Sequence, residues 1–343
     1  MPPMLMLPDP AATATERILA ELEERIHKEY REAVKEADKK WRDYLSAFDK
    51  QDKVEAARLA KGEITQQQYQ AWRQRHIAMG KSWEDMRNTL AQDYHNRNLI
   101  ATKLAKGAQA DVYALNYNYA TYRIENQGKI DTSFTLYNHD TAEALLKKEW
   151  AISPESGKNA FLPKPSAKKK KWLRENADIA WNKEKLQSAV TQGILTGESL
   201  DDIARRLAQV AVMDEHQAIR TARTMTTNVQ NYGRMQAADR AASLGVEIMD
   251  EWSATLDGVT RHSHRVIHGE RKPHDSDEPF SNGCRWPGDP AGPAKEVYNC
   301  RCTLLNWVKG FEGDTVKKSP GMGDMSFEEW QEAHVRLGYG NLH

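Results

Sequence analysis

The residues best suited to chemistry are cysteines and histidines in the last third of the sequence. The chain has three cysteines, and all of them lie in one short stretch, as Cys284, Cys300 and Cys302. Cys300 and Cys302 are two positions apart, so on an extended strand both thiols face the same side and can share one tetrahedral ion. A disulfide between them would be strained, because the short ring cannot reach relaxed geometry. The spacing therefore favours a metal over a disulfide.

A tetrahedral metal needs two more ligands. Cys284 and one of the nearby histidines, His264, His262 or His268, would complete a Cys3His set. The softness of these ligands and their geometry suit zinc, and a site closed by four protein ligands is structural. We therefore predict a structural zinc site at Cys284, Cys300, Cys302 and His264.

A simpler alternative is that the cysteines stay reduced and pack as small apolar residues beside a surface group of histidines. Fifteen residues separate Cys284 from Cys300, which is not a standard zinc-finger spacing. The sequence leaves both interpretations open.

Other residues of the same stretch have types that hold a small domain together. Trp252 and Phe280 are large apolar side chains, which we expect in the core of an α+β domain. Asp257 and Arg261 lie four residues apart around a glycine, so their side chains can pair across a turn and fix it. Such a pair is structural unless a cleft forms around it.

The elements that position these residues are mostly helical, because apolar residues upstream recur every three or four positions. Two helical stretches separated by Lys61 and Gly62 predict a hairpin that ends at Gly107. Residues 111–140 are rich in Tyr, Asn and Thr, which predicts packing between helices and a short ribbon. Ser199 is the expected N-cap of a later helix. The expected fold is mainly α with a small α+β C-terminal domain.

A chain of 343 residues is long enough for two or three domains. We expect a helical N-terminal arm with a Tyr-rich ribbon over residues 1–150 and a basic, proline-containing linker over 151–171. A helical domain over 172–250, the small Cys/His domain over 251–310 and a C-terminal tail over 311–343 complete the expected organisation.

The charge distribution bears on nucleic-acid binding. Lys and Arg number 49, as do Asp and Glu, so attraction to DNA must come from local clusters. The expected linker contains the run Lys168, Lys169, Lys170 and Lys171, which can neutralise phosphates by counterion release. The alternative is a solvated lysine run without a ligand. No apolar run reaches the roughly 20 residues of a membrane helix, and no signal peptide is evident, so we expect a protein kept in a cytoplasm.

The C-terminal stretch resembles a known family, the Mu F-like head morphogenesis proteins, which are minor capsid proteins of tailed bacteriophages. The residues that carry the resemblance are Trp252, Asp257, Arg261, His264, Gly269, Phe280, Pro287 to Asp289, and Asn299, Cys300, Arg301 and Cys302. Gly197 to Ser199 and Ala222 to Thr224 resemble the helical part of the family. His262, His268 and Cys284 depart from the pattern. Residues 68–72, 112–122 and 131–137 are similar to N-terminal regions of minor capsid proteins from phages of Gram-positive hosts.

The resemblance implies a structural role and several partners. A minor capsid protein is recruited with the portal protein to the procapsid, where it meets capsid or scaffolding protein and contacts double-stranded DNA during packaging or ejection. It is located in the virion, inside the head near the portal, and in the bacterial host cytoplasm during assembly. We therefore expect a head morphogenesis protein, with no catalytic residues and no membrane contact.

Two alternatives belong to other functional classes. One is a metal-dependent nuclease acting on phage or host DNA, with His264 as general base and Asp257 and another histidine as metal ligands. Only about forty residues follow Cys302, which is too few for a further toxin or nuclease domain. The other is a non-specific DNA-binding protein, although no helix-turn-helix or aromatic RNA-binding signature is present.

Overall fold

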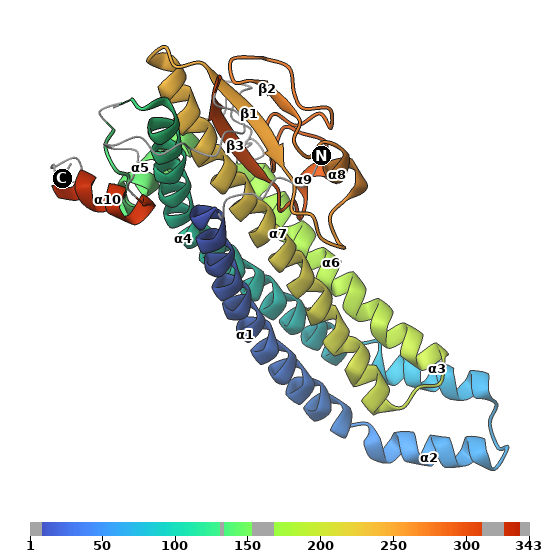
Figure 1. Ribbon diagram of the computed structural model, residues 1–343. Coiled ribbons are helices and arrows are strands. Elements are labelled where there is room, and N and C mark those ends of the chain that lie inside the picture. The colour runs from blue at the N-terminus through green and yellow to red at the C-terminus, as the bar shows by residue number, and fades with distance from the viewer. Residues whose placement is uncertain (1–8, 131–133, 153–167, 311–325, 337–343) are drawn as a thin grey trace. The chain divides into compact units, whose positions relative to one another are not determined.

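The computed structural model describes residues 9–130, 134–152, 168–310 and 326–336. The chain forms two compact units. One, here called the head unit, comprises Met1–Leu22, Leu104–Lys164 and Arg220–His343; the other, the helical unit, comprises Glu23–Lys103 and Pro165–Ile219. Three long helices, α1 (Pro10–Ser46), α4 (Lys81–Gly128) and α7 (Leu200–Ser243), contribute residues to both units (Figure 1). Among the described helices, none is long and apolar enough to cross a membrane.

The helical unit is built from parts of those three helices together with α2 (Asp49–Ala60), α3 (Gln66–Ile77) and α6 (Lys168–Leu195). Trp41 and Trp83 form the centre of its core, with ring centroids 5.8 Å apart in an edge-to-face arrangement. The backbone N–H of Asp202 donates to the hydroxyl of Ser199, so Ser199 caps α7 as predicted.

Helix α4 continues to Gly128. The prediction that the hairpin ends at Gly107 is therefore wrong, and so is the predicted Tyr-rich ribbon for the residues up to Gly128. A glycine inside a helix costs only about 1 kcal/mol, which tertiary packing can offset. Tyr113 and Tyr117, four residues apart on α4, stack with ring centroids 5.9 Å apart. Tyr117 also stacks on Tyr137 at 4.3 Å, so the tyrosine-rich composition reflects a buried helix face.

The predicted linker is partly helical. Helix α5 (His139–Ile152) ends inside it, and α6 begins at Lys168, since lysine is a good helix former. Residues 153–167 lie outside the described residues, and the predicted domain boundaries remain predictions.

The head unit contains an antiparallel sheet of strand order β2-β1-β3, made of β1 (Ile248–Ser253), β2 (Arg271–Pro273) and β3 (Thr303–Val308). Short helices α8 (His262–Val266) and α9 (Ala294–Val297) interrupt the long connections, and α10 (Phe327–Arg336) follows the sheet. The C-terminal part of α7 lies beside the sheet (Figure 1). The prediction of a mainly α fold with a small α+β C-terminal domain is confirmed.

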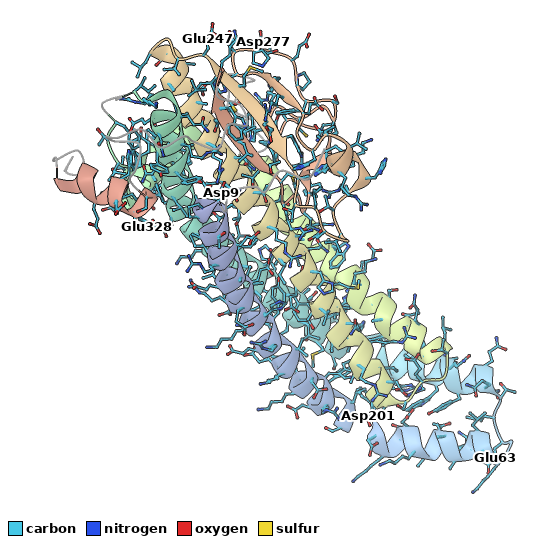
Figure 2. All side chains as sticks on the ribbon, viewed as in Figure 1. Asp9, Glu63, Asp201, Glu247, Asp277 and Glu328 are labelled. Atoms are coloured by element: carbon cyan, nitrogen blue, oxygen red, sulfur yellow. The ribbon has the colours of Figure 1, made fainter. Side chains whose placement is uncertain are left out.

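A buried ion pair ties the start of α1 to α7 within the head unit. Asp9, labelled in Figure 2, accepts hydrogen bonds from both terminal nitrogens of Arg234 at 2.7 and 3.0 Å. Arg234 is only 1% exposed and also donates to Asn116 of α4. Such a bidentate pair fixes the relative position of the three helices in this unit, because a misplaced guanidinium would lose several hydrogen bonds at once.

Candidate metal centre

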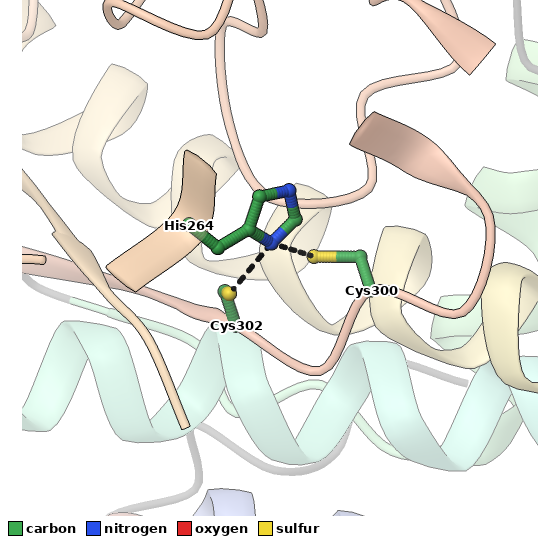
Figure 3. A group of neighbouring side chains, drawn as sticks. All are labelled: His264, Cys300 and Cys302. Carbon is green, nitrogen blue, oxygen red and sulfur yellow. Dashed lines mark hydrogen bonds between the residues drawn. The ribbon is translucent and has the colours of Figure 1, made fainter. Parts of the chain in front are cut away.

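Three side chains from two segments of the head unit lie close together (Figure 3). His264 lies in α8, whereas Cys300 and Cys302 lie just before β3. The Nδ1 atom of His264 is 3.2 Å from Sγ of Cys302 and 3.8 Å from Sγ of Cys300. All three ligand atoms lie within 4.8 Å of one another, and each residue is no more than 2% exposed. The group offers three buried ligand atoms, two of them sulfur, that can bind one metal ion.

Two polar residues of α7 position the cysteine segment. The hydroxyl of Thr227 donates to the carbonyl of Cys300. One turn later, the side-chain amide of Asn231 donates to the carbonyl of Cys302 at 3.0 Å, and its oxygen accepts from the N–H of Leu304 at 2.7 Å. These bonds fix both the segment that carries the thiols and the start of β3, and the buried Asn231 gains partners for its amide. The sequence prediction missed both residues, although two polar residues four apart on an apolar helix face are a usable signal.

The imidazole of His264 is held on both sides. The ring of Trp252 meets it edge to face, with centroids 5.2 Å apart. Oε2 of Glu296 lies 3.0 Å from Nε2 of His264 without hydrogen-bond alignment, and it accepts a hydrogen bond from the hydroxyl of Ser263 at 2.7 Å. Histidines that bind metal through one nitrogen usually face a carboxylate with the other. Glu296 therefore occupies the position of an outer-shell partner that leaves Nδ1 for a metal.

The two thiols shift each other's pKa in opposite directions. A hydrogen bond with Cys300 lowers the pKa of the Cys302 thiol, and contact with His264 acts in the same direction. The same hydrogen bond, together with burial, raises the pKa of the Cys300 thiol. A metal ion binds both cysteines as thiolates, so its binding would release the protons that the two thiols hold.

The dimensions of the group fit zinc. Zinc binds sulfur at about 2.3 Å and histidine nitrogen at about 2.0 Å, so the ligands of a tetrahedral ion lie about 3.5 Å from one another. The two separations from His264 Nδ1, 3.2 and 3.8 Å, bracket that value. These three residues can therefore hold a zinc ion with little movement.

The predicted fourth ligand lies elsewhere. Cys284 is buried but does not belong to the group, and a Cβ on Gly292 would lie 2.5 Å from its sulfur. Burial raises the pKa of the Cys284 thiol to about 12. His262 is exposed, and Nδ1 of His268 accepts a hydrogen bond from the backbone of Ala254. None of these three residues joins the group.

The predicted pair of Asp257 with Arg261 is wrong. Asp257 instead forms a two-pronged ion pair with Arg301, with separations of 2.6 and 2.7 Å. Hydrogen bonds from Arg301 and Thr260 hold the pKa of the Asp257 carboxyl well below its usual range. Arg261 donates to the carbonyl of Tyr298. Spacing along the chain misled the prediction, because the segment that closes the domain brings Arg301 to Asp257 from 44 residues away.

Two other predicted positions have clear structural roles. Trp252 is fully buried and packs edge to face on Phe280, with centroids 5.4 Å apart. Asn299 adopts a left-handed backbone, with φ 54°, and its N–H donates to the hydroxyl of Thr224 at 3.2 Å. Asparagine tolerates that conformation better than most residues, which explains its place before Cys300. Lys168 to Lys171 lie in the first turn of α6, and their side chains fall outside the described residues.

The chain is similar to several known proteins. Residues 184–305 match the family of phage Mu protein F like proteins. The chain is 27% identical over 234 residues to the minor head protein GP7 of Bacillus phage SPP1, a match covering 67% of this chain and 68% of that protein. It is also 29% identical over 239 residues to the NAD(+)–arginine ADP-ribosyltransferase EFV of Enterococcus faecalis, covering 68% of this chain but only 45% of that protein. No solved structure matches the chain significantly.

Proposed function

We propose that this chain, a Mu F-like phage minor head protein, acts in head morphogenesis by binding the portal and the capsid interior during procapsid assembly. The observation that carries the proposal is the family match over residues 184–305, which includes the whole Cys/His group. The similarity to a phage minor head protein over two thirds of both chains supports the same role. The proposed location is the virion, inside the head near the portal, after assembly in the host cytoplasm.

The partners are proposed from the family resemblance and from the chemistry of the two units. The portal protein and capsid or scaffolding protein are the expected protein partners. Double-stranded DNA is a further expected partner during packaging or ejection, with Lys168 to Lys171 as one candidate contact. The helical unit offers charged helix surfaces for such contacts, with ion pairs such as Lys53 with Asp49 on its exterior.

We further propose that the group at His264 binds a structural zinc ion. Zinc would hold α8 and the segment before β3 together, and so stiffen the head unit as a binding surface. The support is the spacing of the three ligands, their burial and the carboxylate of Glu296 behind the imidazole.

A structural role suits this site better than a nuclease. A catalytic metal keeps a coordination position open to water and substrate, whereas His264 is 1% exposed. Asp257, the carboxylate that the nuclease alternative requires, is exposed, bound to Arg301 and absent from the group. The match to the ADP-ribosyltransferase spans less than half of that protein, and its activity is not transferred to this chain.

The assembly role is tested by co-expression with the portal protein of the same phage. We expect the two proteins to elute together in size-exclusion chromatography, at a volume earlier than that of either alone. The capsid protein of an unrelated phage serves as the negative control. Separate elution at micromolar concentrations of both proteins would refute the proposed portal contact.

A further inference from the structure

Two arginines contact Tyr298, in the segment that carries the two cysteines, and a third arginine lies one helical turn after one of them. Arg220 and Arg265 are exposed, and Arg261 is half-buried. In the part of the chain that the structure describes, no carboxylate lies within ion-pair distance of any of the three. Tyr298 itself is 51% exposed. We call these four residues the arginine surface.

The contacts within the head unit show how this surface is organised. The guanidinium of Arg220 lies over the ring of Tyr298, 5.5 Å from its centroid. Arg261 donates to the backbone carbonyl of Tyr298. The backbone N–H of Arg265 donates to the carbonyl of Arg261 at 3.0 Å, so the two residues are one helical turn apart. Arg220 thus lies over the exposed ring, Arg261 contacts the backbone of the same residue, and Arg265 follows one turn further along the chain in α8.

Two other arginines of the head unit pair with carboxylates, unlike the three arginines of this surface. Arg271 pairs with Glu251 at 2.6 Å, and Arg285 pairs with Asp289 at 2.8 Å. The two nearby acids are committed elsewhere: Asp257 binds Arg301, and Glu296 is buried behind His264. A set of arginines that the fold leaves without carboxylates favours an external anion.

We propose that the arginine surface binds the phosphate backbone of nucleic acid. Guanidinium groups match phosphate oxygens in bidentate geometry, and the exposed face of a tyrosine beside them can contact a sugar or a base. The proposal deepens the DNA contact of the proposed function and moves it from the lysine run to the head unit. The surface shares its chain segments with the metal ligands, because Arg261 and Arg265 flank His264 and Tyr298 precedes Cys300 by two residues.

The test is a fluorescence anisotropy titration of the purified chain with a labelled 30-base-pair DNA duplex at several salt concentrations. The variant carries Arg220→Gln, Arg261→Gln and Arg265→Gln. If each arginine neutralises one phosphate, the slope of log K against log salt falls by about 2.7, because each contact contributes about 0.9. The matched control removes three exposed arginines elsewhere, Arg17, Arg25 and Arg75, by the same substitution, and should leave the slope unchanged.

Two results would overturn the proposal. One is an unchanged slope in the triple variant while circular dichroism shows the fold intact. The other is an equal loss of slope in the control variant. Co-elution with the portal protein is measured on the same variants. A variant that loses DNA binding but still binds the portal protein supports the arginine surface as a DNA contact and leaves the proposed assembly role intact. An arginine variant that loses portal binding but keeps the DNA slope would assign the surface to an acidic protein partner.

Discussion

Asp214 is a buried carboxyl whose titration should make the helical unit less stable at neutral pH. It lies on α7 and is fully buried. The hydroxyl of Tyr30 donates to its Oδ2 at 3.2 Å, while Oδ1 has no hydrogen-bond partner in the described part of the chain. Asp178 lies close enough to repel it and is itself bound to His95 at 2.7 Å. Replacing Asp214 with Asn keeps an acceptor for Tyr30 and removes the charge.

The size of the effect follows from the pKa. Burial, together with the charge of Asp178, raises the pKa of Asp214 from 3.8 to about 7. Because the folded state holds the proton more tightly, the unit is most stable below pH 3.8 and loses stability as pH rises through 7. The full loss is about 4 kcal/mol, at about 1.4 kcal/mol per unit of pKa shift. Roughly 2.5 kcal/mol of it falls between pH 5 and pH 8.

Urea unfolding followed by circular dichroism at pH 5 and pH 8 measures this difference. We expect Asp214→Asn to gain about 2.5 kcal/mol over the natural sequence between the two pH values. Asp93→Asn is the control, since the partly exposed pair of Asp93 with Lys40 should contribute less than about 1 kcal/mol at both pH values. Equal pH dependence in the natural chain and in Asp214→Asn would refute the reasoning.

Three further predictions concern the head unit. Burial lowers the pKa of His274, but hydrogen bonds with two aspartates outweigh it and raise the pKa to about 9. The free energy of unfolding of the head unit should therefore fall by about 3 kcal/mol as the pH rises from 6.5 through 9. His274→Gln should abolish that pH dependence in urea titrations. Gly233→Ala should lower the stability by about 1 to 3 kcal/mol in thermal melts, because the added Cβ would lie 2.8 Å from the carbonyl oxygen of Tyr113. Gly107→Ala is the matched control: open space surrounds this position, so the substitution should stabilise α4. Cys302→Ser should abolish metal binding and lower the melting temperature by the same amount as chelator does in the natural chain, which differential scanning fluorimetry can compare.

The sequence was sufficient to identify much of the candidate site. Two thiols spaced two apart and a histidine in the same stretch pointed to a metal group, and the structure brings those three side chains together. The fourth ligand could not be identified, because the path of the chain between β2 and α9 decides that Cys284 packs against Gly292. Thr227 of α7 was missed for a related reason, since its partner is a backbone carbonyl that sequence patterns do not reveal.

The fold was predicted in kind but not in its boundaries. Helical periodicity identified the helices, and the cysteine-containing stretch was recognised as a small mixed domain. The tyrosine-rich stretch was expected to pack between helices and a short ribbon, whereas Tyr113 and Tyr117, four residues apart, lie on the buried face of one helix, α4. Tyr117 stacks there on Tyr137, a contact that the local sequence does not reveal. Asp257 paired with a distant arginine for the same reason, because tertiary contacts outweighed a spacing rule.

The measurement that tests the zinc proposal most directly is X-ray absorption at the zinc edge of protein purified without chelator, with metal content determined in parallel. We expect about one zinc per chain, two sulfur neighbours at about 2.3 Å and a nitrogen neighbour at about 2.0 Å. Cys302→Ser should remove the zinc, whereas Cys284→Ser should retain it with the same two sulfur neighbours. A natural chain with only trace metal, or zinc surrounded by nitrogen and oxygen alone, would contradict the account.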